Sequence, residues 1–301
     1  MKDYERLLSY EIPDVHVTRS ERDTILYALG IGLGADPVNP KELRFVYEKE
    51  LLALPTMALS LCAPHAWVKQ SGTGFGRRSV TSWQSFVLHR PISVAGEFYG
   101  RAKVISVVDK GPGRGAIVTA ARELFAGTGE HIASLEADTF CRGDGGFGGP
   151  TAPVRTPHPL PESNPHFSCE VHTLPQAALM YRLSGDYNPL HVDPTHARAV
   201  GFPRPNLHGL CTMGIAGYAI IKTLCDYDAL ALKSMEARFT APVYPGDTLR
   251  TEMWIAGAEI SYRAVVPERG NVVVIDNGHA RLARILTLPH PRPMSGRSAV
   301  D

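Results

Sequence analysis

The sequence predicts an α+β fold built from two tandem copies of one unit, each an antiparallel sheet wrapped around a central helix, with the helix reduced in the first copy. Three observations support this. The two halves carry turn and strand patterns in the same order, a glycine- and proline-rich segment separates them, and one long segment of the second half is apolar on every side. A helix that is apolar all round must be buried.

The repeated pattern is a proline, a short gap, a glycine followed by an acid, and then a strand-like segment. It occurs at 90–97 and again at 241–247. The strand-like segments are 102–108, 116–124 and 131–140 in the first half, and 250–256, 260–266 and 271–283 in the second. Turns with proline and glycine recur by chance, but the shared order favours duplication.

A boundary is predicted near the middle of the 301-residue chain. Glycines crowd residues 143–149, and prolines follow up to residue 161, a composition typical of loops and extended linkers. We therefore expect an N-terminal domain over 1–149, a linker over 150–165, and a C-terminal domain over 166–301.

The buried helix is predicted at about 207–226, where small residues would let a sheet approach closely. Its counterpart, at about 55–67, is shorter and interrupted by proline, so the first copy is expected to have lost most of its helix. A sheet curled around one helix, in two copies, is a double hot-dog arrangement.

Composition excludes several functional classes. The net charge of +1 gives no electrostatic case for nucleic acid or an acidic membrane. The longest apolar stretch, 209–224, contains Thr212 and Lys222 and is too short for a membrane span. Five widely spaced cysteines and the absence of an apolar signal core indicate a reducing, cytoplasmic location.

The most informative segment is 181–193, which places Asp186 and His191 on one short stretch. Gly185 and Pro189 disfavour a helix there, and Asn188-Pro189 is typical of a turn. A loop that folds back would point both side chains at one place. An acid and an imidazole that face each other can exchange protons with a water molecule. The alternative is that Asp186 caps a turn and His191 is an ordinary core or surface histidine.

A second candidate lies where the buried helix begins, at Gly209. Backbone N–H groups at a helix start carry partial positive charge and have no acceptor within the helix. The N–H of Gly209 could hold a thioester oxygen as that oxygen gains negative charge. The glycine also permits close packing, and both roles are compatible.

A metal site was the competing interpretation for His191, Asp193, His196 and His208, since these residue types bind zinc or iron. The sequence has no His-Glu-x-x-His helix, and Asp193 precedes Pro194 as in an ordinary turn. We therefore expect no metal.

The segment 181–193 resembles the hydratase 2 motif of the MaoC-like dehydratase family. Segments 202–212 and 238–254 are similar to parts of its two-domain (3R)-specific enoyl-CoA hydratases. The resemblance implies a catalytic pair, Asp186 and His191, with Gly209 as the oxyanion donor. It makes the C-terminal domain the catalytic one and implies that the N-terminal domain contacts acyl and coenzyme A groups. It implies substrate contacts from Lys110, Tyr187, Asn188, Pro189, Leu190, His208 and Phe239. The family often has His-Gly where this chain has Thr81-Ser82.

The activity implied by this resemblance is reversible hydration of trans-2-enoyl-CoA to (3R)-3-hydroxyacyl-CoA. No cofactor is expected beyond the coenzyme A that the substrate carries, and a homodimer is expected. Three alternatives stay open: a hot-dog acyl-CoA thioesterase, a dehydratase of acyl-carrier-protein substrates, and a non-catalytic acyl-binding protein.

Overall fold

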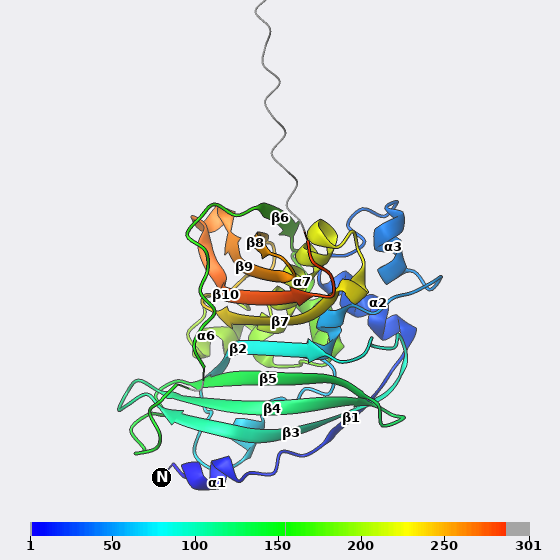
Figure 1. Ribbon diagram of the computed structural model, residues 1–301. Coiled ribbons are helices and arrows are strands. Elements are labelled where there is room, and N and C mark those ends of the chain that lie inside the picture. Colours follow the sequence, from blue (N-terminus) through cyan, green and yellow to red (C-terminus); the bar gives the residue numbers. More distant parts are fainter. Residues whose placement is uncertain (1, 154, 287–301) are drawn as a thin grey trace, which may run out of the picture.

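The computed structural model describes residues 2–153 and 155–286. One residue of the predicted linker and the last fifteen of the predicted catalytic domain, 287–301, therefore lie outside the described residues. Ten strands form one antiparallel sheet in the order β1-β3-β4-β5-β2-β7-β10-β9-β8-β6 (Figure 1). In the first half these are β1 (Val15–Arg19), β2 (Ser79–Leu88), β3 (Gly96–Asp109), β4 (Ala116–Ala126) and β5 (His131–Cys141). In the second they are β6 (Phe167–His172), β7 (Leu232–Phe239), β8 (Thr248–Ala256), β9 (Glu259–Val266) and β10 (Val272–Leu282).

The strand order confirms the predicted duplication. From its outer edge inwards, the first half runs β1-β3-β4-β5-β2, and the second runs β6-β8-β9-β10-β7. Each strand of one half thus has a counterpart at the same place in the other. The two halves meet where β2 pairs with β7, with Trp83 opposite Arg238 and Val87 opposite Ser234.

In Figure 1, the long helix α7 (Gly209–Leu224) lies behind the strands of the second half. The α-helices are α1 (Tyr4–Leu8), α2 (Glu21–Gly30), α3 (Pro40–Val46), α4 (Trp67–Gln70), α5 (Ala177–Tyr181), α6 (Pro194–Ala199) and α7 (Gly209–Leu224). The 3-10 helices are η1 (Pro55–Leu59), η2 (Arg182–Ser184), η3 (Pro189–His191), η4 (Ala229–Ala231) and η5 (Pro267–Arg269). Among the described residues, none of the helices is long and apolar enough to cross a membrane.

The central helix of the second half is α7, which is buried over nearly its whole length. Its small residues admit the sheet as expected, since a Cβ on Gly217 would lie 3.1 Å from Sδ of Met235 on β7, and they also admit the first half. A Cβ on Gly217 would lie 2.4 Å from Cγ2 of Thr56, and one on Gly214 would lie 3.0 Å from the Tyr27 hydroxyl. Thr56 belongs to η1 and Tyr27 to α2, so the helix is enclosed by both halves.

The first half has only the short 3-10 helix η1 in the corresponding place, which confirms the predicted reduction. Pro64 explains why no helix runs from 55 to 67, because proline disfavours helical geometry in the residue before it. The buried guanidinium of Arg122, on β4, fills the adjoining space. Its Nη2 donates to the carbonyls of Ala58 and Leu59, at 3.0 and 3.1 Å. Burial lowers the pKa of Arg122 to about 10, so the group keeps its charge at neutral pH.

The described residues between β5 and β6 form no helix or strand. They are nevertheless attached to the sheet. Arg155 stacks over Trp83, with 3.5 Å between its Cζ and the ring centroid, and Trp254 donates from Nε1 to the Ser163 carbonyl at 2.8 Å. The five cysteines are all free, as expected for a chain without a disulfide framework.

Candidate active site

The loop 181–193 folds back because of three local features. Gly185 has a φ of +127°, in the region that favours glycine, and reverses the chain after η2. The Asp186 carboxylate then accepts the backbone N–H of Asn188, at 3.1 Å. Asn188 in turn caps η3 by accepting the Leu190 N–H, at 3.0 Å. Together these turns bring Asp186 and His191 round to the same side of the loop.

The carboxylate of Asp186 and ring nitrogens of His191 and His208 all lie within 4.8 Å of one another. Two polar groups that share one bridging water molecule are separated by about 4.5–5.5 Å, since each hydrogen bond spans about 2.8 Å. The separation therefore suits one water held between Asp186 and His191. The predicted meeting of these two side chains is present, while their catalytic roles stay a prediction.

His191 is buried and held in one orientation. Its Nδ1 lies 2.9 Å from the backbone carbonyl of Asn206, which can only accept, so Nδ1 carries the proton. The other ring nitrogen, Nε2, is left with a free lone pair. Burial lowers the pKa of His191, so the ring is neutral at neutral pH and can accept a proton.

His208 lies beneath the loop, only 1% exposed. Its Nε2 donates to the backbone carbonyl of Asp186 at 3.1 Å, and its ring stacks on that of His191 with centroids 3.7 Å apart. Burial, with His191 beside it, lowers its pKa to about 3, so it too is neutral. The structure thus places this predicted substrate residue as a support for the backbone of Asp186.

Gly209 begins α7, so its N–H has no acceptor within the helix. The ring of Phe239, from the end of β7, lies beside it: a Cβ on Gly209 would be 3.5 Å from Cε1 of that ring. An apolar wall and a free N–H are therefore next to His208, which precedes Gly209 directly. A free N–H of this kind can stabilise an oxyanion, and this role of Gly209 stays a prediction.

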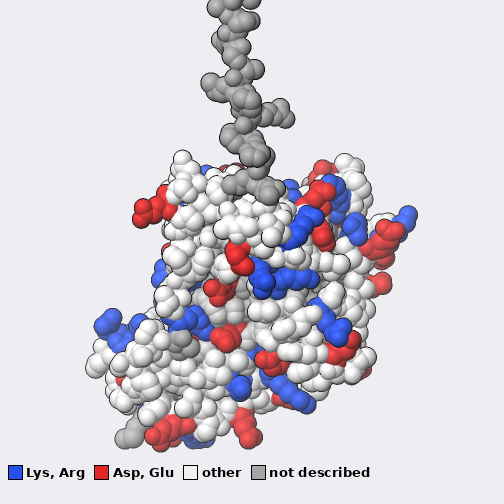
Figure 2. All heavy atoms as spheres, in the orientation of Figure 1, with Lys and Arg blue, Asp and Glu red and all other residues white. Residues whose placement is uncertain are grey.

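The remaining predicted substrate residues lie in two places. On the catalytic loop, Tyr187, Asn188 and Pro189 are exposed, and Leu190 is buried. Lys110 lies far along the chain, in the exposed turn between β3 and β4. Figure 2 shows Lys and Arg side chains gathered at that end of the sheet.

The turn that carries Lys110 is held by the preceding residue, Asp109. Its carboxylate accepts the N–H groups of Gly146, Gly111 and Gly148, at 2.7 to 2.9 Å, and these bonds hold its pKa below its ordinary value. The glycine-rich segment 143–149 is thus clamped to the Lys110 turn. At the same end of the sheet, Arg142 stacks over Phe202 of the second half, with 5.8 Å between its Cζ and the ring centroid.

Comparison with known proteins identifies the family of this chain. Residues 157–277 match the model of the MaoC-like domain, and residues 18–143 match that of the hydratase 2 N-terminal domain of the MFE-2 enzymes. "Enoyl-CoA hydratase 2, peroxisomal" of Arabidopsis thaliana is 37% identical, over 89% of this chain and 92% of that protein. The chain belongs to the MaoC-like dehydratase family.

Other members of the MaoC-like family are similar along most of their length. "Enoyl-CoA hydratase ChsH3" of Mycobacterium tuberculosis is 34% identical, over 91% of this chain and 96% of its own. A MaoC-like dehydratase from Phytophthora capsici has a solved structure that superposes with a TM-score of 0.80 at 32% identity, covering 94% and 99% of the two chains. A more distant M. tuberculosis protein, 17% identical with a TM-score of 0.57, is described as a double hot-dog fold, which matches the fold seen here.

One residue of this MaoC-like site was missed by the sequence interpretation. Nδ1 of His65, from the N-terminal half, lies 3.6 Å from Oδ1 of Asp186. No motif surrounds His65. The only sequence signal was its isolation as a basic group within the apolar stretch 51–68.

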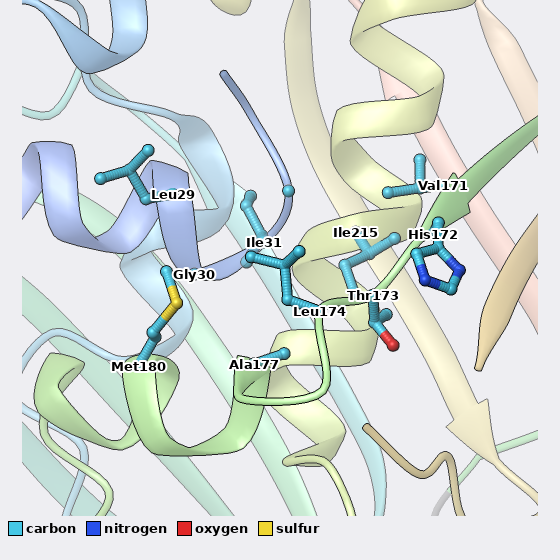
Figure 3. A pocket seen from close by; sticks show the side chains of 11 residues that line it. Leu29, Gly30, Ile31, Val171, His172, Thr173, Leu174, Ala177, Met180 and Ile215 are labelled. Carbon is cyan, nitrogen blue, oxygen red and sulfur yellow. The ribbon is translucent and has the colours of Figure 1, made fainter. Parts of the chain in front are cut away.

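The three atoms of Asp186, His191 and His208 would also suit a metal ion by residue type. The prediction of a metal-free site stays a prediction. A separate apolar recess, with room for about 10 Å³, lies between α2, α5, β6 and α7, and Figure 3 shows Leu29, Ile31, Met180 and Ile215 at its walls. It can hold about one water molecule, so it is no binding site for an acyl chain as it stands.

Proposed function

We propose that the protein catalyses the reversible hydration of trans-2-enoyl-CoA to (3R)-3-hydroxyacyl-CoA. The observation that carries the proposal is the approach of Asp186 and His191 to within 4.8 Å, on a folded-back loop beside the start of α7. The high identity to enoyl-CoA hydratases along most of the chain supports it.

In the proposed mechanism, Asp186 and His191 hold one water molecule. His191 has a lone pair on Nε2 because Nδ1 donates to the Asn206 carbonyl. One member of the pair takes a proton from the water as its oxygen bonds to C3 of the substrate. The electrons of the C2=C3 bond move toward the thioester carbonyl, and the pair then returns a proton to C2. The net change is addition of one water molecule, and dehydration is the reverse.

The N–H of Gly209 would stabilise the thioester oxygen while it carries negative charge. Such donors act most strongly where water is excluded, and Phe239 covers this end of the helix. The N-terminal domain would supply coenzyme A contacts through the Lys110 turn, and the catalytic loop would supply Tyr187, Asn188, Pro189 and Leu190. We propose a homodimer as the assembly, which light scattering would test.

Purified protein should remove the absorbance of the enoyl group of crotonyl-CoA and of longer trans-2-enoyl-CoAs. The product should be the (3R)-alcohol by chiral chromatography. The same reactions followed with a thiol reagent test the thioesterase alternative, because only hydrolysis releases free coenzyme A. Release of coenzyme A without loss of the enoyl group would reject the proposal.

The dehydration direction has its own support. The relative named "3-hydroxyacyl-thioester dehydratase Y", from M. tuberculosis, is 37% identical over 78% of this chain. We therefore expect (3R)-3-hydroxyacyl-CoA to yield the enoyl thioester, while the (3S)-alcohol is left unchanged. Matched substrates on coenzyme A and on acyl-carrier protein would identify the carrier that the protein prefers.

A further inference from the structure

A segment of the N-terminal half, residues 58–66, lies directly against the catalytic loop. A Cβ on Gly185 would lie 3.9 Å from the Ser60 carbonyl. Nearby, Nη2 of Arg19 donates to the Ser184 carbonyl at 3.0 Å. His65 lies near the end of this segment, and its Nδ1 is 3.6 Å from Oδ1 of Asp186. Two segments far apart in sequence thus meet at the proposed catalytic carboxylate.

The backbone of this segment has unusual φ values, and contacts with other elements hold it in place. Cys62 and Ala66, on either side of His65, have φ values of +52° and +57°, a region costly for residues other than glycine. Such conformations persist only where the surroundings impose them, and they concentrate at functional sites. Arg122 provides one such restraint, through its hydrogen bonds to the Ala58 and Leu59 carbonyls.

We propose that His65 is a positioning residue for Asp186, contributed to the active site by the N-terminal domain. Its Nδ1 approaches Oδ1 of Asp186, which also accepts the Asn188 N–H, and the contact would restrict the orientation of the carboxylate. The inference rests on the proposed hydratase function. His65 is not proposed to exchange protons with the substrate.

The charges around His65 agree with this role. Burial lowers its pKa, the Asp186 carboxylate raises it, and Arg122 lowers it again. His191 and His208, the other titratable groups of the site, are neutral at neutral pH because burial also lowers their pKa values. His65 is therefore neutral under those conditions, and the carboxylate selects the tautomer with the proton on Nδ1.

Asparagine is the informative replacement, because its amide nitrogen occupies about the place of Nδ1 and can donate to the carboxylate. In the hydration assay, His65→Ala should lower kcat by about 10- to 100-fold, the range that misplacement of a reacting group produces, with KM within about twofold. His65→Asn should restore most of kcat, and His16→Ala, at an exposed position on β1, should change neither parameter.

Equal loss in the alanine and asparagine variants would show a purely structural role and overturn the proposal. Unchanged kcat in His65→Ala would overturn it as well. If the unaltered protein hydrates no enoyl thioester, the proposed function fails, and the contact is then judged by NMR titration. The C2 proton of His65 should titrate at lower pH in Asp186→Asn than in the unaltered protein, and an unchanged titration would reject the pair.

Discussion

The two halves share one strand order but differ in what the sheet encloses. The second half wraps the 16-residue helix α7, whereas the first half has the five-residue helix η1 in that place. The candidate acid, base and oxyanion donor all belong to the half that kept its helix. The half that lost it contributes Arg122, the Lys110 turn and the irregular segment that ends at His65. In the proposed function, one copy therefore carries the chemistry and the other builds surroundings for it.

The largest expected effect tests whether chemistry belongs to the second half alone. Asp186→Asn and His191→Ala should each lower kcat of crotonyl-CoA hydration by about 10²- to 10⁴-fold, the usual loss when an acid–base partner is removed. Circular dichroism should show the fold intact. His89→Ala, at an exposed position directly after β2 in the first half, is the matched control. Near-normal turnover in either loop variant would refute the assignment.

The next largest effect concerns Arg122, which fills space in the first half where the second half has its long helix. Arg122→Met should reduce the free energy of unfolding by about 2–3 kcal/mol, because it leaves two buried carbonyls without donors. Denaturant unfolding measures this. Arg101→Met, on the neighbouring strand β3, removes an exposed pair with Asp14 and should change stability by less than about 0.5 kcal/mol. Equal effects of the two substitutions would contradict the role given to Arg122.

The contact between α7 and η1 offers a smaller effect. Gly217→Ala should destabilise the protein by about 1–2 kcal/mol, because overpacking outweighs the better helix propensity of alanine. The new Cβ would lie 2.4 Å from Cγ2 of Thr56. Thr56→Ser removes that methyl group, so the double variant should recover much of the loss. Failure of this rescue would mean that the clash lies elsewhere.

The last effect concerns pH. Burial lowers the pKa values of His191 and His208 in the folded chain, so the unfolded chain binds more protons below about pH 6.5. Stability is therefore full above that pH and falls on acidification, for His208 down to about pH 3. Each histidine contributes at most about 1.4 kcal/mol per pH unit. Thermal melting between pH 7 and pH 5 should show the fall, and His208→Asn should make it shallower than in His16→Ala.

Much of this fold could be predicted because its signals are local. An all-apolar stretch predicted α7, and alternating strand-like segments predicted β3, β4, β5, β8, β9 and β10. The strands β1 and β6 are short edge strands, and β2 and β7 carry polar or charged residues along much of their length, so their patterns are weak. These four strands form because they pair with other strands in the folded sheet.

The candidate site also has one part that the sequence predicts and another that it does not. Asp186 and His191 are close in sequence, and glycine and proline reveal the bend that joins them. His65 meets Asp186 only through the packing of two halves, and no spacing rule covers such a contact. The burial of His208 likewise depends on the stacking of two rings and on a bond to a backbone carbonyl, neither of which composition indicates.

The pairing of β2 with β7 has a consequence for attempts to divide the molecule. Expressed alone, either half would present a long strand with unpaired backbone groups, which is the kind of edge that recruits other chains into aggregates. A protease cut between β5 and β6 should act differently, because both pieces would still share that strand ladder and the packing around α7. Nicked protein is thus expected to migrate as one particle until it is denatured.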